Sequence, residues 1–163
     1  MIFEKSVGVV IFRKDKNDIL YLLLYYPADK SRSGTGGYFS FVKGHQEKGE
    51  SDLETMKREL KEETGIDKIE IIPGFLEKEE YFFKDIYKNK KNPPLIKKQV
   101  VYFLGKIKTA KIKLSFEHKD YKWFTFQEAI KSLKFKNDKI ILKKAHSFLI
   151  NYLNSKNENS SKK

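Results

Sequence analysis

The chain has 163 residues, of which 39% are hydrophobic and 14% aromatic, which suits one globular domain and excludes a disordered polybasic tail. It contains no cysteine, which excludes disulfides, thiolate zinc sites and a cysteine nucleophile and suits a cytoplasmic location. A net charge of +12 favours anionic partners such as nucleotides, nucleic acid or an acidic surface, with a genome-wide preference for lysine as the alternative explanation.

The N-terminal part predicts strands. Residues 6–12 (SVGVVIF) and 19–26 (ILYLLLYY) are apolar and rich in β-formers, and the turn RKDKND between them predicts an antiparallel pair. The first strand has an acid before its apolar run and no small-residue cleavage site, so we do not interpret it as a signal peptide. No run of roughly eighteen apolar residues occurs, and we expect no membrane span. Residues 38–44 predict a further short strand.

An acidic helix is predicted over residues 52–64. Ser51 and Glu54 have the spacing of a capping box, and Gly65 is a natural terminator. The apolar stripe of this helix is expected to comprise Leu53, Met56 and Leu60.

The C-terminal part continues the mixed pattern. The predicted strands cover residues 69–83, 97–107 and 121–126, and the predicted helices cover 126–133 and 139–153. We expect residues 1–153 to form a single α/β domain with helices on the faces of a sheet, and residues 154–163 to form a disordered polar tail.

Three carboxylates of the acidic helix, Glu59, Glu62 and Glu63, lie at i, i+3 and i+4 and so share one face. Their mutual repulsion calls for compensation by a hard divalent cation, and Mg²⁺ prefers carboxylate oxygens together with substrate phosphates. The repulsion also raises one carboxyl pKa, which suits a general base. The alternative for these three residues alone is a solvated Glu-rich face.

The longer pattern runs from Gly44 over five residues to Glu50, then over seven to Arg58-Glu59-Leu60, and then through Glu62-Glu63 to Gly65-Ile66. This pattern resembles the Nudix box at every fixed position. The resemblance implies the Nudix fold, an αβα sandwich with a central mixed sheet. It also implies Mg²⁺-dependent hydrolysis, with Mn²⁺ as a substitute, of a nucleoside diphosphate linked to another group.

The resemblance assigns roles within the box. Glu59, Glu62 and Glu63 are the expected metal ligands, and Glu62 is our choice as general base. Arg58 is expected to pair with a nearby carboxylate and hold the acidic face together, while Glu50 braces the loop.

The flanking segments narrow the family. VKGHQEKGE, LSFEHKDYKWFTFQEAIKSLKF and KKAHSFLINYL resemble segments of the asymmetric diadenosine tetraphosphate hydrolases, and the likeness spans Val7 to Leu153. It implies cleavage of diadenosine tetraphosphate to ATP and AMP. Phe39 and Val42 depart from the family, which usually has Trp and Pro there, and the loop FKDIYKNKKNPPL is longer, so base preference stays open.

The same resemblance implies further site residues. Glu117 is expected to approach the metal, with an exposed loop acid as the alternative. Tyr81 and Phe148 are expected to sandwich the adenine, with core packing as the alternative. The residues expected near the phosphates are Lys43, Gly44, His45 and Lys98, with a structural hydrogen bond as the alternative role of His45. His118 and His146 are interpreted as structural residues.

Other functions remain open. The substrate is alternatively a triphosphorylated RNA 5′ end, which the basic residues 88–98 suit, or a nucleoside triphosphate. A nucleotide-sensing domain without activity is the alternative of a different class, against which the complete glutamate set argues. We expect a monomer.

Overall fold

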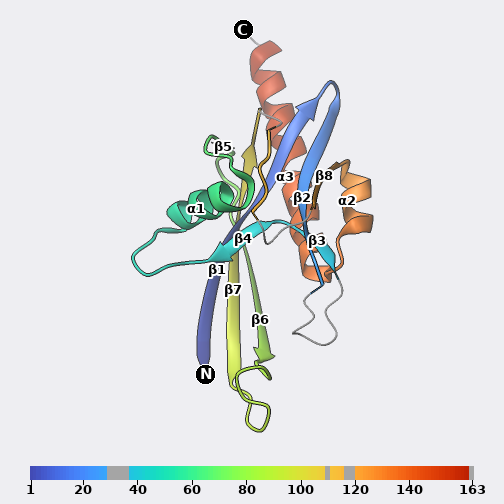
Figure 1. Cartoon of the computed structure of the whole chain (residues 1–163). Coiled ribbons are helices and arrows are strands. Elements are labelled where there is room, and N and C mark those ends of the chain that lie inside the picture. Colours follow the sequence, from blue (N-terminus) through green and yellow to red (C-terminus); the bar gives the residue numbers. More distant parts are fainter. Residues whose placement is uncertain (29–36, 109–110, 116–119, 162–163) are drawn as a thin grey trace.

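The computed structural model of this chain describes residues 1–28, 37–108, 111–115 and 120–161 (Figure 1). In these residues, four strands precede the first helix, four more follow it, and two helices come last. In chain order the elements are β1 Ile2–Asp15, β2 Asp18–Tyr26, β3 Tyr38–Ser40, β4 Val42–His45, α1 Asp52–Thr64, β5 Glu70–Ile71, β6 Glu77–Lys84, β7 Leu95–Lys106, β8 Asp120–Phe124, α2 Phe126–Ser132 and α3 Lys136–Ser161.

The strands form one mixed sheet. Its main path runs β3-β2-β1-β7-β5, with β4 paired to β1, β6 to β7 and β8 to β2. The predicted antiparallel opening pair is confirmed, with Ile11 opposite Leu22. β1 and β7 pair in parallel over eleven positions, from Ile2 opposite Ile96 to Phe12 opposite Lys106. This parallel pair joins the first strand of the chain to a strand about ninety residues later.

Helices cover both faces of this sheet, which confirms the predicted αβα sandwich (Figure 1). α1 packs on one face, where Met56 and Leu60 are buried against β1 and β2. α2 and α3 pack on the other face, where Leu142 and Leu149 belong to a second apolar cluster. Leu53, expected in the buried stripe of α1, is 38% exposed because it lies at the solvent side of the first turn.

Two predicted strands are each divided in the structure. Residues 38–44 form β3, which pairs with β2, and β4, which pairs with β1, with the buried Phe41 between them. Residues 69–83 form β5 and β6, separated at Pro73 and Gly74. Gly74 has φ +92°, a conformation that breaks an extended run.

The C-terminal helix is longer than the sequence suggested. α3 continues to Ser161, through residues that were expected to form a disordered tail. Polar composition alone does not end a helix, and residues 154–161 contain neither Pro nor Gly to stop it. The boundary of the single domain at residue 153 stays a prediction. No helix in the described part of the chain is long and apolar enough to cross a membrane.

Candidate active site

α1 presents its three glutamates in different environments. The helix begins where the Ser51 hydroxyl accepts a hydrogen bond from the Glu54 amide, and it ends at Gly65, which has φ 76°. These are the boundaries that the sequence predicted. Glu63 is only 6% exposed, whereas the Glu62 side chain is 57% exposed and that of Glu59 is 13% exposed. One helical turn therefore offers one buried, one partly buried and one solvent-facing carboxylate.

Arg58 connects these acids to the loop before the helix. Its guanidinium contacts Glu50 at 2.7 Å, Glu59 at 2.8 Å and Glu62 at 3.2 Å. It also donates to the backbone carbonyl of His45 at 2.8 Å. Arg58 therefore pairs with carboxylates, as expected. Its single positive charge offsets the repulsion among the three carboxylates that it contacts.

Glu50 closes the loop in the way the sequence suggested. Its carboxylate accepts hydrogen bonds from the Glu47 amide at 2.8 Å and from the Thr55 hydroxyl at 3.2 Å, in addition to Arg58. The hydrogen bond from Arg58, followed by that from the Glu47 amide, lowers the pKa of Glu50 from 4.5 to about 2. The hydrogen bond with Glu50 in turn raises the pKa of Arg58. Both groups are therefore charged throughout the neutral range.

Gly44 lets the chain approach the acidic helix closely. A side chain at this position would overlap the Glu59 carboxyl group. Oxygen donors of this kind suit a hard divalent cation. Within the described residues, however, no three acidic or imidazole groups are gathered closely enough to hold an ion, and Glu59 and Glu62 are turned toward Arg58.

Glu117, the expected ligand from outside the box, lies outside the described residues, as does His118. The segment that leads to it begins beside α1, because the Ser115 amide donates to the Glu63 carbonyl at 3.2 Å. The carboxylate donors of α1 fit the expected cation by their chemistry.

A basic group occupies the other face of β4. Lys43 and His45 alternate with Gly44 and so point away from Glu59. The Lys98 ammonium lies 3.3 Å from His45 Nδ1 and 3.8 Å from a Glu4 oxygen, and Lys98 is 8% exposed. Burial lowers the pKa of Lys98, and burial together with the Lys98 charge lowers that of His45. The structure thus brings together the predicted phosphate-contacting residues His45 and Lys98.

The two residues of the predicted aromatic pair pack beside different rings. The Tyr81 ring lies 6.1 Å from that of Phe83 on β6, whereas the Phe148 ring lies 5.6 Å from that of Phe75 and stacks on Tyr152. The adenine sandwich therefore stays a prediction. The interpretation of His146 as structural agrees with its contacts: it stacks on Phe126 and is hydrogen-bonded to the Tyr21 hydroxyl.

Comparison with known proteins identifies the family of this chain. The sequence profile described as the NUDIX domain matches residues 3–144, most of the chain. This chain belongs to the Nudix family.

Individual relatives are more specific than the Nudix profile. The chain is 34% identical over 155 residues to the asymmetrical bis(5′-nucleosyl)-tetraphosphatase of Mus musculus, covering 89% of this chain and 95% of that protein. It is similar to the crystal structure of a C. elegans Ap4A hydrolase binary complex, with a TM-score of 0.71, 30% identity and coverage of 91% and 98% of the two chains. Over 103 residues, 60% of this chain and 65% of that protein, it is 43% identical to the RNA pyrophosphohydrolase of a Nitratiruptor species.

The structure also shows a polar cluster that sequence reasoning missed. The Ser40 hydroxyl donates to Asp138 at 2.8 Å, and Asp138 is 2% exposed. Glu79 Oε2 and the Tyr102 hydroxyl are buried without a hydrogen-bond partner within the described part of the chain. Burial, and then the charge of Asp138, raises the pKa of Glu79. These residues come from four distant elements, so no local pattern marks them.

Tyr81 lies at the edge of this cluster in the Nudix domain. Burial raises its pKa, and Glu79, Asp138 and Tyr38 raise it further. Tyr38 in turn contacts Phe135 edge-to-face at 4.9 Å, and Phe135 is 40% exposed. Tyr38 on the short strand β3 is therefore a second aromatic residue whose charge acts on Tyr81.

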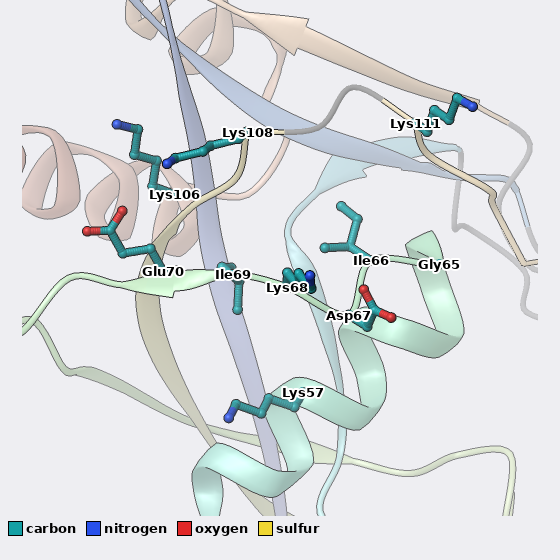
Figure 2. Close-up of a pocket in the computed structure, with 10 residues that line it drawn as sticks. All are labelled: Lys57, Gly65, Ile66, Asp67, Lys68, Ile69, Glu70, Lys106, Lys108 and Lys111. Carbon is teal, nitrogen blue, oxygen red and sulfur yellow. The ribbon is translucent and has the colours of Figure 1, made fainter.

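A separate cavity of about 670 Å³ lies on the opposite flank of the Nudix helix (Figure 2). Figure 2 shows Lys57 on α1, Ile69 on the segment toward β5 and Lys106 at the end of β7 around it. Residues 57 and 59 are about 200° apart around an α-helix. The cavity therefore does not belong to the carboxylate face.

Proposed function

We propose that this chain hydrolyses a phosphoanhydride bond of a dinucleoside polyphosphate, and that it cleaves diadenosine tetraphosphate asymmetrically to ATP and AMP. The observation that carries the proposal is the complete set of Glu59, Glu62 and Glu63 on one face of α1, braced by Arg58. It stands in a chain whose similarity to the asymmetrical tetraphosphatase of Mus musculus extends over nearly its full length.

The proposed division of labour follows burial. Glu59 and Glu63, with Glu62 on the same face and Glu117 from the neighbouring segment, would hold Mg²⁺ or Mn²⁺. A bound ion neutralises phosphate charge and lowers the pKa of water. Glu62 is the most exposed of the three helical acids, so it is placed to accept the proton of an attacking water. Arg58 acts as a positioning residue, because it contacts Glu50, Glu59 and Glu62 at once.

The basic face of β4 would bind the phosphates. Lys98 and His45 are already adjacent, and a partly buried ammonium interacts with an anion more strongly than an exposed one. Lys43 adds a second cation next to Gly44. Tyr81 would stack on a base, which holds any base with little discrimination. The second ring of the sandwich, assigned to Phe148, remains a proposal.

The test is product analysis of diadenosine tetraphosphate incubated with the protein and Mg²⁺ in ¹⁸O-labelled water. ATP and AMP are the expected products, and mass spectrometry of the label identifies the phosphorus that water attacks. Two molecules of ADP would reject asymmetric cleavage. Absence of turnover together with tight nucleotide binding would favour the sensing domain.

A second substrate class is a triphosphorylated RNA 5′ end. Two observations favour it: the similarity to an RNA pyrophosphohydrolase and the basic residues 88–98. Release of pyrophosphate from a 5′-triphosphorylated oligonucleotide, faster than cleavage of diadenosine tetraphosphate at equal concentration, would establish it. The monomeric state and the cytoplasmic location remain proposals.

A further inference from the structure

Exposed apolar side chains gather at one end of the sheet. Nine of the fourteen large hydrophobic side chains that are exposed in the described part of the chain lie there: Met1, Ile2, Phe3, Tyr81, Phe82, Phe83, Ile86, Tyr87 and Leu95. In Figure 1 the start of β1, the start of β7 and the end of β6 extend beyond α1 and α3, with no helix over them. This end of the sheet is therefore an uncovered surface rather than part of the core.

Strand register places two phenylalanines in one row on this surface. Phe82 of β6 is opposite Lys97 of β7, and Lys97 is opposite Phe3 of β1, so the three side chains share a face. Phe3 and Phe82 are each 58% exposed. The Lys97 ammonium lies 5.9 Å from the centre of the Phe82 ring. We call Phe3, Lys97 and Phe82 the sheet-end platform.

The loop beside the platform is rich in lysine. Residues 84–91 contain four lysines and a single acid, Asp85. Lys97 also pairs with Glu80 at 3.7 Å, which holds its side chain along the strand. A partner of this surface must therefore offer flat apolar groups and negative charge together. The net charge of +12 disfavours a second copy of the chain as that partner.

We propose that the sheet-end platform binds single-stranded nucleic acid, with bases stacked on Phe3 and Phe82 and phosphates held by Lys97 and the lysines of the adjacent β6–β7 loop. Aromatic rings on a sheet surface bind unpaired bases, and cations between them bind the backbone. The two phenylalanines are two strands apart, about 9.5 Å, which leaves room for one base on each ring. A duplex hides its base faces and cannot make these contacts.

The platform continues toward the acidic helix. Two residues after Phe3, Lys5 pairs with Asp52 at the start of α1 at 2.7 Å, and its carbonyl accepts a hydrogen bond from the Gln46 amide. Two strand residues span about 7 Å. The platform therefore lies close to the loop that precedes the glutamates of α1. The proposal that the platform binds nucleic acid does not depend on which polyphosphate is hydrolysed at α1.

The experiment measures fluorescence anisotropy of a twelve-nucleotide RNA with a 3′ fluorophore and a 5′ hydroxyl, in EDTA. Such an RNA has no polyphosphate, so its binding can fail while dinucleotide hydrolysis succeeds, and the reverse. We expect Phe82→Ala and Phe3→Ala each to weaken binding about tenfold, and Phe82→Trp to retain it. Lys97→Gln should reduce the slope of log affinity against log salt by about 0.7.

Matched controls come from exposed apolar residues elsewhere. Leu76→Ala and Ile150→Ala remove side chains that are 51% and 38% exposed away from the platform, and both should bind RNA like the parent chain. Thermal unfolding of all variants verifies folding. Unchanged RNA affinity in the Phe3→Ala, Phe82→Ala double variant, or equal affinity for duplex RNA, would overturn the proposal. A dimer in sedimentation that Phe82→Ala disperses, without RNA binding, would instead assign the surface to self-association.

Discussion

A single arginine sets the electrostatics of the acidic helix. Arg58 contacts Glu50, Glu59 and Glu62, and it also donates to a backbone carbonyl of the preceding loop. Like charges at i, i+3 and i+4 destabilise a bare helix. The guanidinium offsets that repulsion because its five donors form a rigid fork that serves several acceptors at once. A lysine at this position would supply the charge without the same set of contacts.

Glu50→Gln is expected to lower thermal stability at pH 7 and to have a smaller effect in acid. The folded pKa of Glu50 is about 2, below its ordinary 4.5, so the ionised carboxylate stabilises the fold above pH 4.5. This contribution is lost as pH falls toward 2. Melting temperatures of parent and variant should therefore differ most above pH 4.5 and draw together as pH falls from 4.5 toward 2. Glu47→Gln is the control, since Glu47 is 67% exposed and 3.8 Å from Arg58. An equal loss at pH 7 and in acid would contradict the assignment.

Glu79→Gln is expected to act in the opposite direction. Burial, then the charge of Asp138, raises the pKa of Glu79 above its ordinary 4.5, so the folded state binds this proton more tightly than the unfolded state. Stability is lost as pH rises through the raised pKa, and a neutral amide avoids that loss. Urea unfolding should show the variant to be more stable than the parent at pH 7 and similar at pH 4. A destabilised variant at pH 7 would be inconsistent with a carboxylate whose ionisation is opposed by burial, and Glu80→Gln serves as the neighbouring control.

At the scale of elements, local signals predicted α1 and long-range pairing escaped prediction. Ser51 and Gly65 end α1 through contacts with residues only a few positions away in the sequence. The structure has the helix bounds that these signals predicted. The parallel pairing of β1 with β7 joins residues about ninety positions apart, for which no local pattern exists. The division at Gly74 depends on a positive φ that one glycine permits but does not require.

In the candidate site, too, contacts between residues close in the sequence were predictable and contacts between distant residues were not. The contacts of Arg58 with Glu50 were predictable, because both residues lie in one short segment of strict spacing. The cluster of Ser40, Glu79 and Asp138 was not, because Ser40 and Asp138 are 98 residues apart. The uncovered end of the sheet follows from where the helices stop, which depends on the packing of the whole domain.

Substitutions on α1 should separate two roles of its glutamates. Glu62→Gln is expected to lower kcat by about 10²–10⁴-fold if Glu62 accepts the proton from water. Glu63→Gln is expected to raise the Mg²⁺ concentration for half-maximal activity by at least about tenfold, because it replaces a buried carboxylate by a neutral amide. Glu54→Gln makes the same charge change on the same helix, away from the acidic face, and should affect neither. Full activity of Glu63→Gln at low Mg²⁺ would contradict its role as a ligand.

At the scale of the whole molecule, the excess of positive charge concerns association rather than folding. The net charge is +12, yet the chemistry is assigned to a cluster of acids on α1. A polyanionic substrate is attracted over the range of the Debye length, about 10 Å at 0.1 M salt. The acidic face alone would repel such a substrate, so we expect the positive charge of the rest of the chain to aid its approach.

The corresponding prediction is that kcat/KM for diadenosine tetraphosphate falls several-fold between 50 and 200 mM salt, while kcat changes little. The variant Lys14→Gln, Lys131→Gln lowers the net charge to +10 (12 − 2) at exposed positions on β1 and α2, far along the chain from the acidic face. If the whole-molecule field drives association, this variant should have a shallower salt dependence and an unchanged kcat. If local contacts dominate, only Lys98→Gln should flatten it, because Lys98 lies beside His45 at the basic face of β4. A kcat/KM that does not depend on salt in the parent chain would exclude both explanations.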